Sequence, residues 1–211
     1  MLIRRIISAC LMLMIVGFAY AQKPADAPDD YWNTITQRSQ KIVDEINGLS
    51  EEQSKELVEK IRYQYYSINK VYDEFDPKFE GADSKKKANL EDKRFKKTEK
   101  LNKKFIASLG KTASPEQVDA VKDGMTYSLF HVTSKAYFDM LPDLTPAQKE
   151  FIEKSLREAR DNAMHTGSSK EKHGWFGKYK GRINNYLSQE GVDLQEARKG
   201  WMERIEKEKA K

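Results

Sequence analysis

The sequence predicts an all-α protein, a multi-helix bundle of about seven helices, from two observations. Glycine and proline are scarce, with 11 and 6 residues among 211, which is unlike a turn-rich β fold. In addition, three segments share a helix-start pattern, in which a Ser or Thr precedes a Gln by three residues and apolar residues follow at helical spacing. We find no segment whose alternation convincingly predicts a strand.

The three helix starts are the segments LSEEQ (49–53), ASPEQ (113–117) and LTPAQ (144–148). In each, the hydroxyl can accept from the amide three residues on while the Gln side chain reaches back, which stabilises a helix start by about 1 kcal/mol. Pro115 and Pro146 fall at the first helical position, which tolerates proline. The middle helix is predicted to run through Val132. The pattern also resembles the repeat of small helical periplasmic stress chaperones, so a chaperone-like module stays open.

The remaining predicted helices follow from the spacing of apolar residues. One runs from Trp32 to Ile46 and ends at Gly48, and another covers 84–109 and ends at Gly110. Two more cover 175–188 and 193–207. Helices joined by short connections favour a single bundle over 31–211.

The first 21 residues have the features of a secretory signal peptide. Arg4 and Arg5 precede an apolar stretch, and Ala19-Tyr20-Ala21 fits a small-x-small cleavage site before Gln22. Cleavage would remove the only cysteine, Cys10, so the mature chain would have neither a disulfide nor a thiol nucleophile. We predict a secreted protein, periplasmic or at the cell surface, with no transmembrane segment in the mature chain. Residues 22–30 are predicted to be a flexible leader outside the core.

Residues 84–104 form a strongly basic segment, with ten Lys or Arg residues and three acids. On a helix, five lysines share one stripe: Lys86, Lys93, Lys97, Lys100 and Lys104. The stripe is either an ordinary solvated face or a positive surface for an acidic polysaccharide or an anionic lipid. Because no aromatic ring interleaves with the lysines, we expect no nucleic-acid partner.

The segment His173 to Tyr186 is rich in aromatic, amide and cationic side chains. On a helix, Trp175, Tyr179 and Tyr186 share an arc with apolar residues. Gly177 and Gly181 lie on the far side, and each costs the helix about 1 kcal/mol, so we expect another backbone or a ligand to approach closely there. An aromatic core stripe with a glycine-mediated helix crossing would explain this pattern, and so would a binding site.

The same side chains suit a sugar. Rings stack against the C–H face of a sugar, while amides and guanidinium groups bind its hydroxyls, and a cation suits a uronate carboxylate. Tyr63 and Tyr66 could extend such a platform. The candidate binding residues are His173, Trp175, Lys178, Tyr179, Arg182, Asn184, Asn185 and Tyr186.

A family resemblance points the same way. The segment KHGWFGKYKGRINNYL (172–187), continued by Gly191-Val192-Asp193-Leu194 and Trp201, resembles the C-terminal signature of secreted Bacteroidetes proteins of unknown function for which sugar binding has been suggested. The resemblance implies a role near polysaccharide breakdown, with pectin-like polymers as one ligand class and other secreted polysaccharide-processing proteins as partners. It brings no catalytic residues.

Signals for catalysis are weak. Asp161, His165 and His173 could face one metal ion, but three such groups occur by chance in a charged helical protein, and the common hydrolase, phosphate-loop and dinucleotide patterns are absent. We therefore predict no metal and no cofactor. The expected function is carbohydrate binding, including acidic polysaccharide fragments, without catalysis. The alternatives are the chaperone-like interaction module and a polysaccharide-active enzyme.

Overall fold

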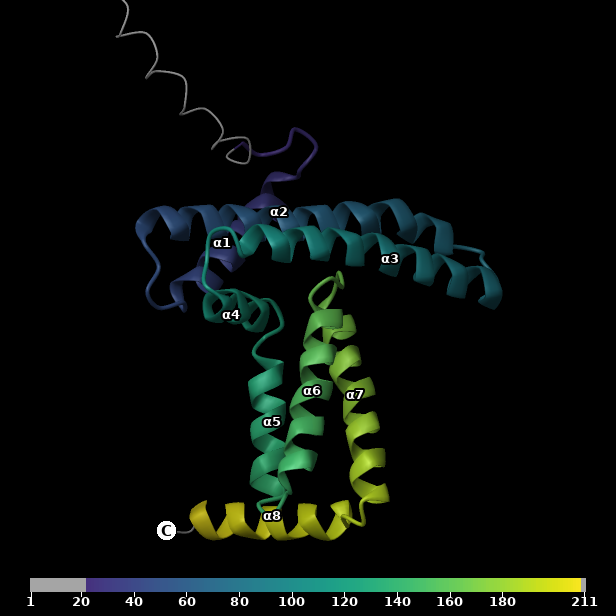
Figure 1. Cartoon of the computed structure of the whole chain (residues 1–211). Coiled ribbons are helices and arrows are strands. Elements are labelled where there is room, and N and C mark those ends of the chain that lie inside the picture. The colour runs from purple at the N-terminus through teal and green to yellow at the C-terminus, as the bar shows by residue number, and fades with distance from the viewer. Residues whose placement is uncertain (1–21, 210–211) are drawn as a thin grey trace, which may run out of the picture.

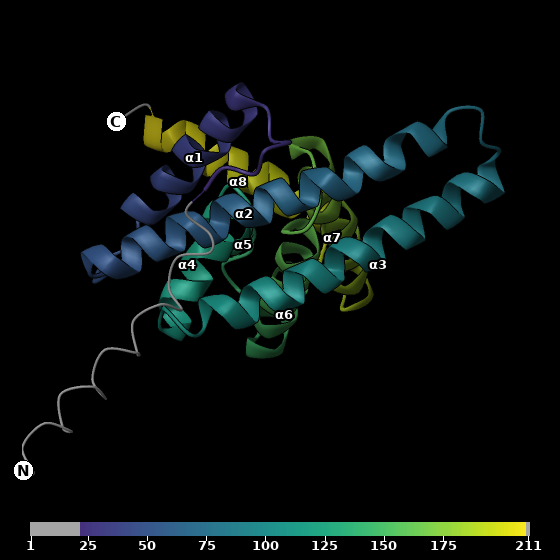
Figure 2. The same ribbon diagram turned by 90° about the horizontal axis from the view of Figure 1, so that it is seen from above.

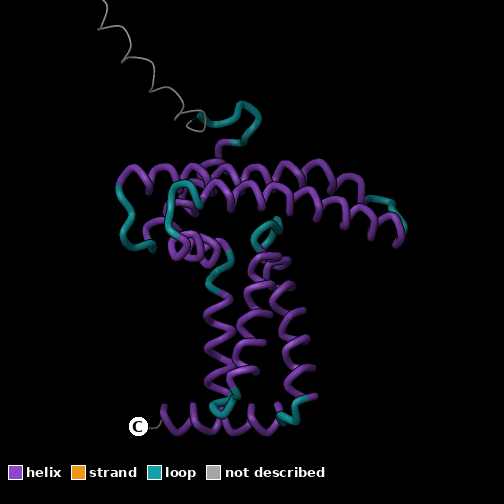
Figure 3. The backbone as a smooth tube through the Cα atoms, in the orientation of Figure 1, coloured by secondary structure: helices purple, strands orange, loops and turns teal. Residues whose placement is uncertain are grey.

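The computed structural model describes residues 22–209, which confirm the all-α class. Helices account for the regular structure of this range, and no strand occurs within it (Figure 3). The elements are α1 (Asp29–Asp44), α2 (Glu51–Phe75), the short 3-10 helix η1 (Asp76–Phe79), α3 (Ser84–Leu109), α4 (Pro115–Met125), α5 (Leu129–Met140), α6 (Pro146–Ala163), α7 (Ser169–Gln189) and α8 (Leu194–Lys209).

The helices are arranged as a crossbar on a stem (Figure 1). Helices α1 to α4 form the crossbar, in which α2 packs against both α1 and α3. Helices α5, α6 and α7 run side by side as the stem, and α8 lies across its far end, which we call the foot. Seen from above, the paired α2 and α3 cross over the ends of α6 and α7 (Figure 2). The corner between crossbar and stem is therefore built from both halves of the chain.

The predicted helix starts are confirmed in atomic detail. At Ser50, the hydroxyl accepts from the Gln53 amide at 3.1 Å, and the Gln53 carbonyl oxygen accepts from the Ser50 amide at 2.9 Å. The same reciprocal pair occurs at Ser114 and at Thr145. A fourth capping box begins α7 six residues earlier than predicted, with Ser168 and Glu171 as its two members. Capping chemistry explains the repeated segment in full.

The predicted helix through Val132 is wrong, because the chain breaks between α4 and α5. Tyr127 and Ser128 adopt left-handed conformations with φ of 58° and 52°, which cost non-glycine residues about 1–3 kcal/mol each. The break redirects the chain from the crossbar into the stem (Figure 1).

A buried ion cluster lies beside this break. Arg160 of α6, 3% exposed, donates to Asp123 at 2.8 Å and to Asp119 at 2.9 Å, both from α4. The second oxygen of Asp123 lies 2.9 Å from Nε2 of His131, at the start of α5. One carboxylate thus joins three helices, and these contacts offset the strain of the connection.

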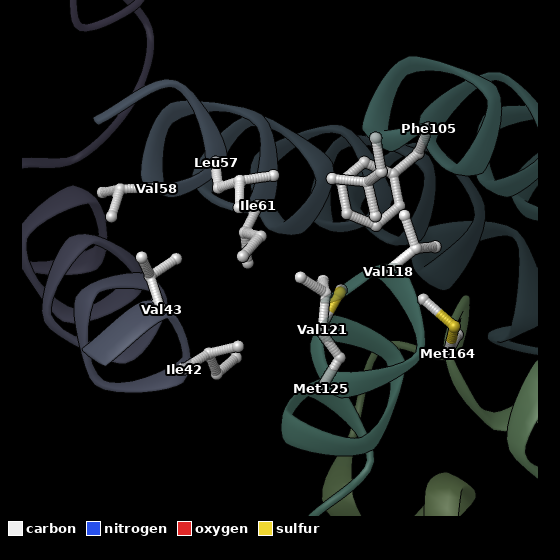
Figure 4. Close-up of a cluster of buried hydrophobic side chains, with 11 residues drawn as sticks. Ile42, Val43, Leu57, Val58, Ile61, Phe105, Val118, Val121, Met125 and Met164 are labelled. Atoms are coloured by element: carbon white, nitrogen blue, oxygen red, sulfur yellow. The ribbon is translucent and has the colours of Figure 1, made fainter. Parts of the chain in front are cut away.

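Each half of the molecule has its own hydrophobic core. The crossbar core draws on α1 to α4 (Figure 4), and the stem core is formed by α5, α6 and α7. Met164, just after α6, is fully buried beside Val118 and Val121 in the crossbar core. Lys172 of α7, 4% exposed, donates to the Ala163 carbonyl at 3.0 Å. Burial lowers the pKa of this lysine to about 8. Met164 therefore joins the stem to the crossbar, and Lys172 ties α7 to the end of α6.

The segment before α1 packs on α2, so the prediction that it lies outside the core is wrong at Ala27, which is 3% exposed. Tyr63 donates its hydroxyl to the Gln22 carbonyl at 2.6 Å, and Tyr66 donates to Asp26 at 2.5 Å. Both rings also meet Trp32 edge to face. These tyrosines therefore hold the leader on α2, far along the chain from the predicted site. The predicted signal peptide, 1–21, lies outside the described residues.

Between residues 22 and 209, no helix combines the length and the apolar character that a membrane span requires.

Candidate functional site

Helix α7 buries one face and leaves its aromatic residues at the edge of that face. Phe176, Ile183 and Leu187 are at most 2% exposed in the stem core. Trp175 and Tyr179 are half-buried beside them, and so is Tyr186. The arc expected from the sequence therefore divides into a core stripe and an accessible edge, because its width exceeds the surface that α5 and α6 cover.

A cavity of about 520 Å³ lies in the corner between crossbar and stem, and we call it the corner pocket. This volume is within the usual range of small-molecule sites. The pocket lies between α2, α3, the α6–α7 connection and the first turns of α7. Its lining consists of Tyr72, Ala88, Glu91, Asp92, Arg94, Phe95, Thr98, His165, Thr166, Glu171, Gly174, Trp175 and Lys178.

Trp175 contributes an indole ring to the lining of the corner pocket. Its ring centre lies 5.6 Å from that of Phe95 on α3 and 6.3 Å from that of Tyr179. The Lys178 ammonium lies 4.8 Å from the indole centre, within the range of cation–π attraction. The indole is thus held on two sides and remains partly exposed, as a stacking surface requires.

Glu171 lines the corner pocket and contacts three other side chains. One carboxylate oxygen accepts from the Tyr72 hydroxyl at 3.0 Å and from Arg94 at 3.2 Å, and the other belongs to the capping box with Ser168. Arg94 also binds Asp76 at 3.1 Å and stacks 4.2 Å from the Tyr72 ring centre. These contacts commit both Arg94 and Glu171, so neither is free to hold a ligand charge. Their role is to join α2, α3 and α7.

His165 is a buried residue of the corner-pocket lining. It is 2% exposed, and its Nδ1 lies 3.0 Å from the Thr98 hydroxyl. Its ring centre lies 4.7 Å from the ring centre of Phe95. Burial lowers the pKa of the imidazole from 6.5 to about 4, so His165 is neutral at pH 7. Its role is packing and hydrogen bonding, not the dipole contact that a helix C-terminus would favour.

The groups considered for a metal do not meet. His165 faces Thr98, whereas His173 stacks 5.9 Å from Tyr127 and Asp161 lies 3.8 Å from Lys122. Across the described part of the chain, no group of three or more His, Cys, Asp or Glu side chains is placed to hold a metal ion.

The predicted binding residues fall on four sides of α7 rather than one. Trp175 and Lys178 line the corner pocket. Along the edge towards α6, Tyr186 stacks on Phe151 at 3.9 Å, and Arg182 binds Glu158 at 2.9 Å.

Of the other four candidates, one lies on this same edge and three lie on other sides of α7. Tyr179 accepts from Asn162 at 3.2 Å and continues the same edge. On the opposite side, Asn184 accepts from Tyr137 at 2.6 Å, and His173 packs on the α4–α5 connection. Asn185 is exposed on the solvent face. Helical periodicity brings these residue types together in sequence, but neighbouring helices divide them.

The glycines of α7 contradict the expectation of a close backbone approach. A Cβ atom placed on Gly174, Gly177 or Gly181 would meet no atom within 4 Å. Gly167, just before α7, differs, because its Cβ would lie 2.7 Å from the Tyr72 ring. The crossing that needs a glycine is therefore at the α6–α7 connection.

The basic stripe of α3 is separate from the corner pocket. Its five lysines are exposed, and none lines the cavity. Lys97 pairs with Glu74 of α2, so part of the stripe is neutralised locally. The remainder fits the solvated-face interpretation.

Sequence reasoning missed several residues of the corner pocket. Glu171 had a readable signal, because Ser168-x-x-Glu171 is a capping box. Tyr72, Arg94 and Phe95 had none, since helices distant in sequence bring them to α7.

The fold and the site define an all-α protein with a ligand-sized cavity where two helical layers meet. The chain belongs to the family described as "Protein of unknown function (DUF3826)", whose model matches residues 32–207. No curated protein matches the chain with significant similarity.

Proposed function

We propose that the protein binds carbohydrate at the corner pocket and has no catalytic role of its own. The observation that carries this proposal is the partly exposed indole of Trp175, which lines a cavity of about 520 Å³. A sugar ring stacks its C–H groups on such a surface, and the surrounding polar groups bind its hydroxyls. Phe95 and Tyr179 hold the indole at ring-centre distances of 5.6 and 6.3 Å, which limits the entropy lost on binding.

The polar groups of the pocket favour a neutral sugar. Glu91 is an exposed carboxylate that accepts hydrogen bonds from hydroxyls, and the exposed Lys178 ammonium donates them. Asp92 also lines the pocket but is engaged by Lys96 at 2.7 Å. Arg94 is committed to Glu171 and Asp76. The lining carries three carboxylates, Glu91, Asp92 and Glu171, against two cations, Arg94 and Lys178, so a uronate would meet a net negative charge, which is unfavourable. The ligand proposed for this pocket is therefore a neutral oligosaccharide.

The proposed setting is outside the cytoplasm, as an accessory to polysaccharide breakdown. The signal-peptide pattern at 1–21 supports secretion. The resemblance of the α7 segment to secreted Bacteroidetes proteins supports the connection with polysaccharides. A chaperone-like module gains less support: the large hydrophobic side chains exposed within 22–209 are Tyr127, Val132 and Met202, which lie on three separate elements rather than one apolar surface.

The test is titration calorimetry of the mature chain with a panel of neutral oligosaccharides. We expect saturable binding to at least one neutral ligand, and loss of ten-fold or more in affinity on Trp175→Ala. Lys178→Ala, an exposed change, should weaken the same ligand by about three- to ten-fold, since a single hydrogen bond to a charged group contributes about 1 kcal/mol or more.

The matched control is Trp201→Ala, which removes a half-buried indole at the foot of the stem. It should leave affinity for neutral sugars unchanged. Circular dichroism melts without ligand would establish that each variant is folded. Binding that survives both Trp175→Ala and Lys178→Ala, or no binding across the panel, would overturn the proposal.

A further inference from the structure

Helix α8 is held on the stem without burying any of its own residues. It crosses the foot (Figure 1), and none of its residues from Leu194 to Lys209 is buried. Leu194 and Ala197 pack partly against the stem core, and Arg204 donates to the Asp139 carbonyl at 2.7 Å. A helix held by so few contacts is free to respond to a ligand beneath it.

A second cavity, of about 580 Å³, lies between α8 and the stem, and we call it the foot pocket. One part of its lining is apolar: Val132, Ala136, Tyr137, Met140, Leu194 and Trp201. Val132 is 62% exposed, which is unusual for a large aliphatic side chain, and Trp201 is half-buried. The pocket therefore offers an indole and an aliphatic wall to a ring-shaped ligand.

The charged groups of the foot pocket are of one sign. Lys180 of α7 and Arg198 of α8 line it, and no carboxylate does. Neither cation has an ion-pair partner among the described residues. The nearby Asp139 is engaged by Lys135 at 2.7 Å. Two uncompensated cations facing one cavity make it attractive to an anion.

The amides of the foot pocket strengthen this preference. The side-chain oxygen of Asn184 accepts from the Tyr137 hydroxyl at 2.6 Å, which leaves the Asn184 NH2 group as a donor. Gln195 contributes a second amide to the lining. Together with the ammonium of Lys180 and the guanidinium of Arg198, the pocket presents mainly donors, as a carboxylate or sulfate requires.

We infer that the foot pocket binds an anionic sugar, with Lys180 and Arg198 holding its acidic group and Trp201 stacking on its ring. The inference rests on the proposed function only for the class of ligand, because the two pockets share no residue. A ligand in this position contacts α5, α7 and α8 at once, so it also fixes α8 on the stem.

The experiment is calorimetry of the mature chain with three ligands of matched length: an oligogalacturonate, a sulfated oligosaccharide and a neutral oligogalactoside. We expect an anionic ligand to bind and its affinity to fall at least ten-fold on Arg198→Ala, and similarly on Lys180→Ala. The first two ligands distinguish a carboxylate from a sulfate as the preferred acid. Both substituted residues are exposed, so the fold should be retained.

The matched control is Lys199→Ala, which removes the exposed cation next to Arg198 that does not line the pocket. It should leave the affinity unchanged, whereas a general charge effect would weaken all three variants alike. Hydrogen exchange gives a second readout: the anionic ligand should slow exchange over 194–209 in the wild type and in Lys199→Ala, and not in Arg198→Ala.

The outcomes separate this inference from the proposed function. Loss of anionic binding in Arg198→Ala, with neutral binding intact, supports the foot pocket. Anionic binding that is equal in Arg198→Ala and the wild type, or the absence of anionic binding while neutral sugars bind, overturns the inference alone. Neutral binding that is insensitive to Trp175→Ala overturns the proposed function alone.

Discussion

The corner pocket and the foot pocket are built on the same helix, yet their electrostatic character is opposite. The corner pocket is lined by three carboxylates, Glu91, Asp92 and Glu171, and by two cations, Arg94 and Lys178, so its lining is net negative. The foot pocket contains Lys180 and Arg198 and no carboxylate. The net charge of the whole chain, +5, does not predict the charge of either pocket. Lys178 and Lys180 lie within one turn of α7, and the neighbouring helix decides the charge balance of each pocket: α3 brings carboxylates to the corner pocket, whereas α8 brings Arg198 to the foot pocket.

The pockets also differ in rigidity. The lining of the corner pocket includes buried side chains, among them Thr98 and His165, each 2% exposed. The foot pocket is closed by a helix without a buried residue. We therefore expect the corner to be preformed and the foot to tighten when it is occupied.

The largest expected effect is a pH dependence of the unfolding free energy that arises from His165 in the corner pocket. The folded pKa of His165, about 4, lies below the unfolded value of 6.5, so its stabilising contribution is complete above pH 6.5 and is lost as the pH falls towards 4. The loss amounts to about 3 kcal/mol of unfolding free energy. Urea denaturation at pH 7 and pH 4 measures it.

His165→Gln is the reference for that measurement, because it cannot titrate while the carboxylates still do. The wild type should lose more stability than this variant between the two pH values. An identical loss in both proteins would mean that His165 is not the titrating group, which would contradict its burial in the corner pocket.

The second prediction compares the stability of alanine substitutions at two glycines near the corner pocket. Gly167→Ala would place a Cβ 2.7 Å from the Tyr72 ring, which Glu171 and Arg94 hold in place. We expect a loss of about 2 kcal/mol, as for overpacking of a fixed contact. Gly174→Ala lines the same pocket but meets no atom within 4 Å, so it should not destabilise. Thermal melts of both variants test this, and equal effects would contradict it.

The smallest effect concerns the open face of α7 between the pockets. Gly177→Ala and Gly181→Ala should each stabilise the protein by about 0.5–1 kcal/mol, because no atom lies near the new methyl group and alanine is the better helix former. Denaturant midpoints measure this gain, with ligand affinities unchanged. Weaker sugar binding in either variant would indicate that a ligand uses this face, and the two pockets would then not be independent.

Part of this fold could be read directly from the sequence because its signals are local. The capping boxes at Ser50, Ser114 and Thr145 were predicted because all their atoms lie within four residues. The break at Tyr127 and Ser128 was not, because neither residue type favours a left-handed conformation and the compensating contacts come from Arg160, more than thirty residues away.

The candidate site was predicted in part for the same reason. The sequence predicts Trp175 and Lys178 as binding residues, and both line the corner pocket. Asn184 and Arg182 were grouped with them, but Tyr137 and Glu158 draw these two side chains to different faces. Phe95 and Tyr72 could not be placed near Trp175, since the chain supplies no local link between α3, α2 and α7.

By itself, the sequence determined where helices begin, which face of each is apolar, and that the segment around Trp175 carries ring and cationic groups unusual for a simple core helix. Only the tertiary structure decided that α7 borders two cavities, that acids from α3 surround one of them, and that α8 leaves the cations of the other unpaired. The physical reason is range: helix periodicity and capping depend on neighbours within a turn, whereas pocket shape and charge balance depend on helices that meet only after packing.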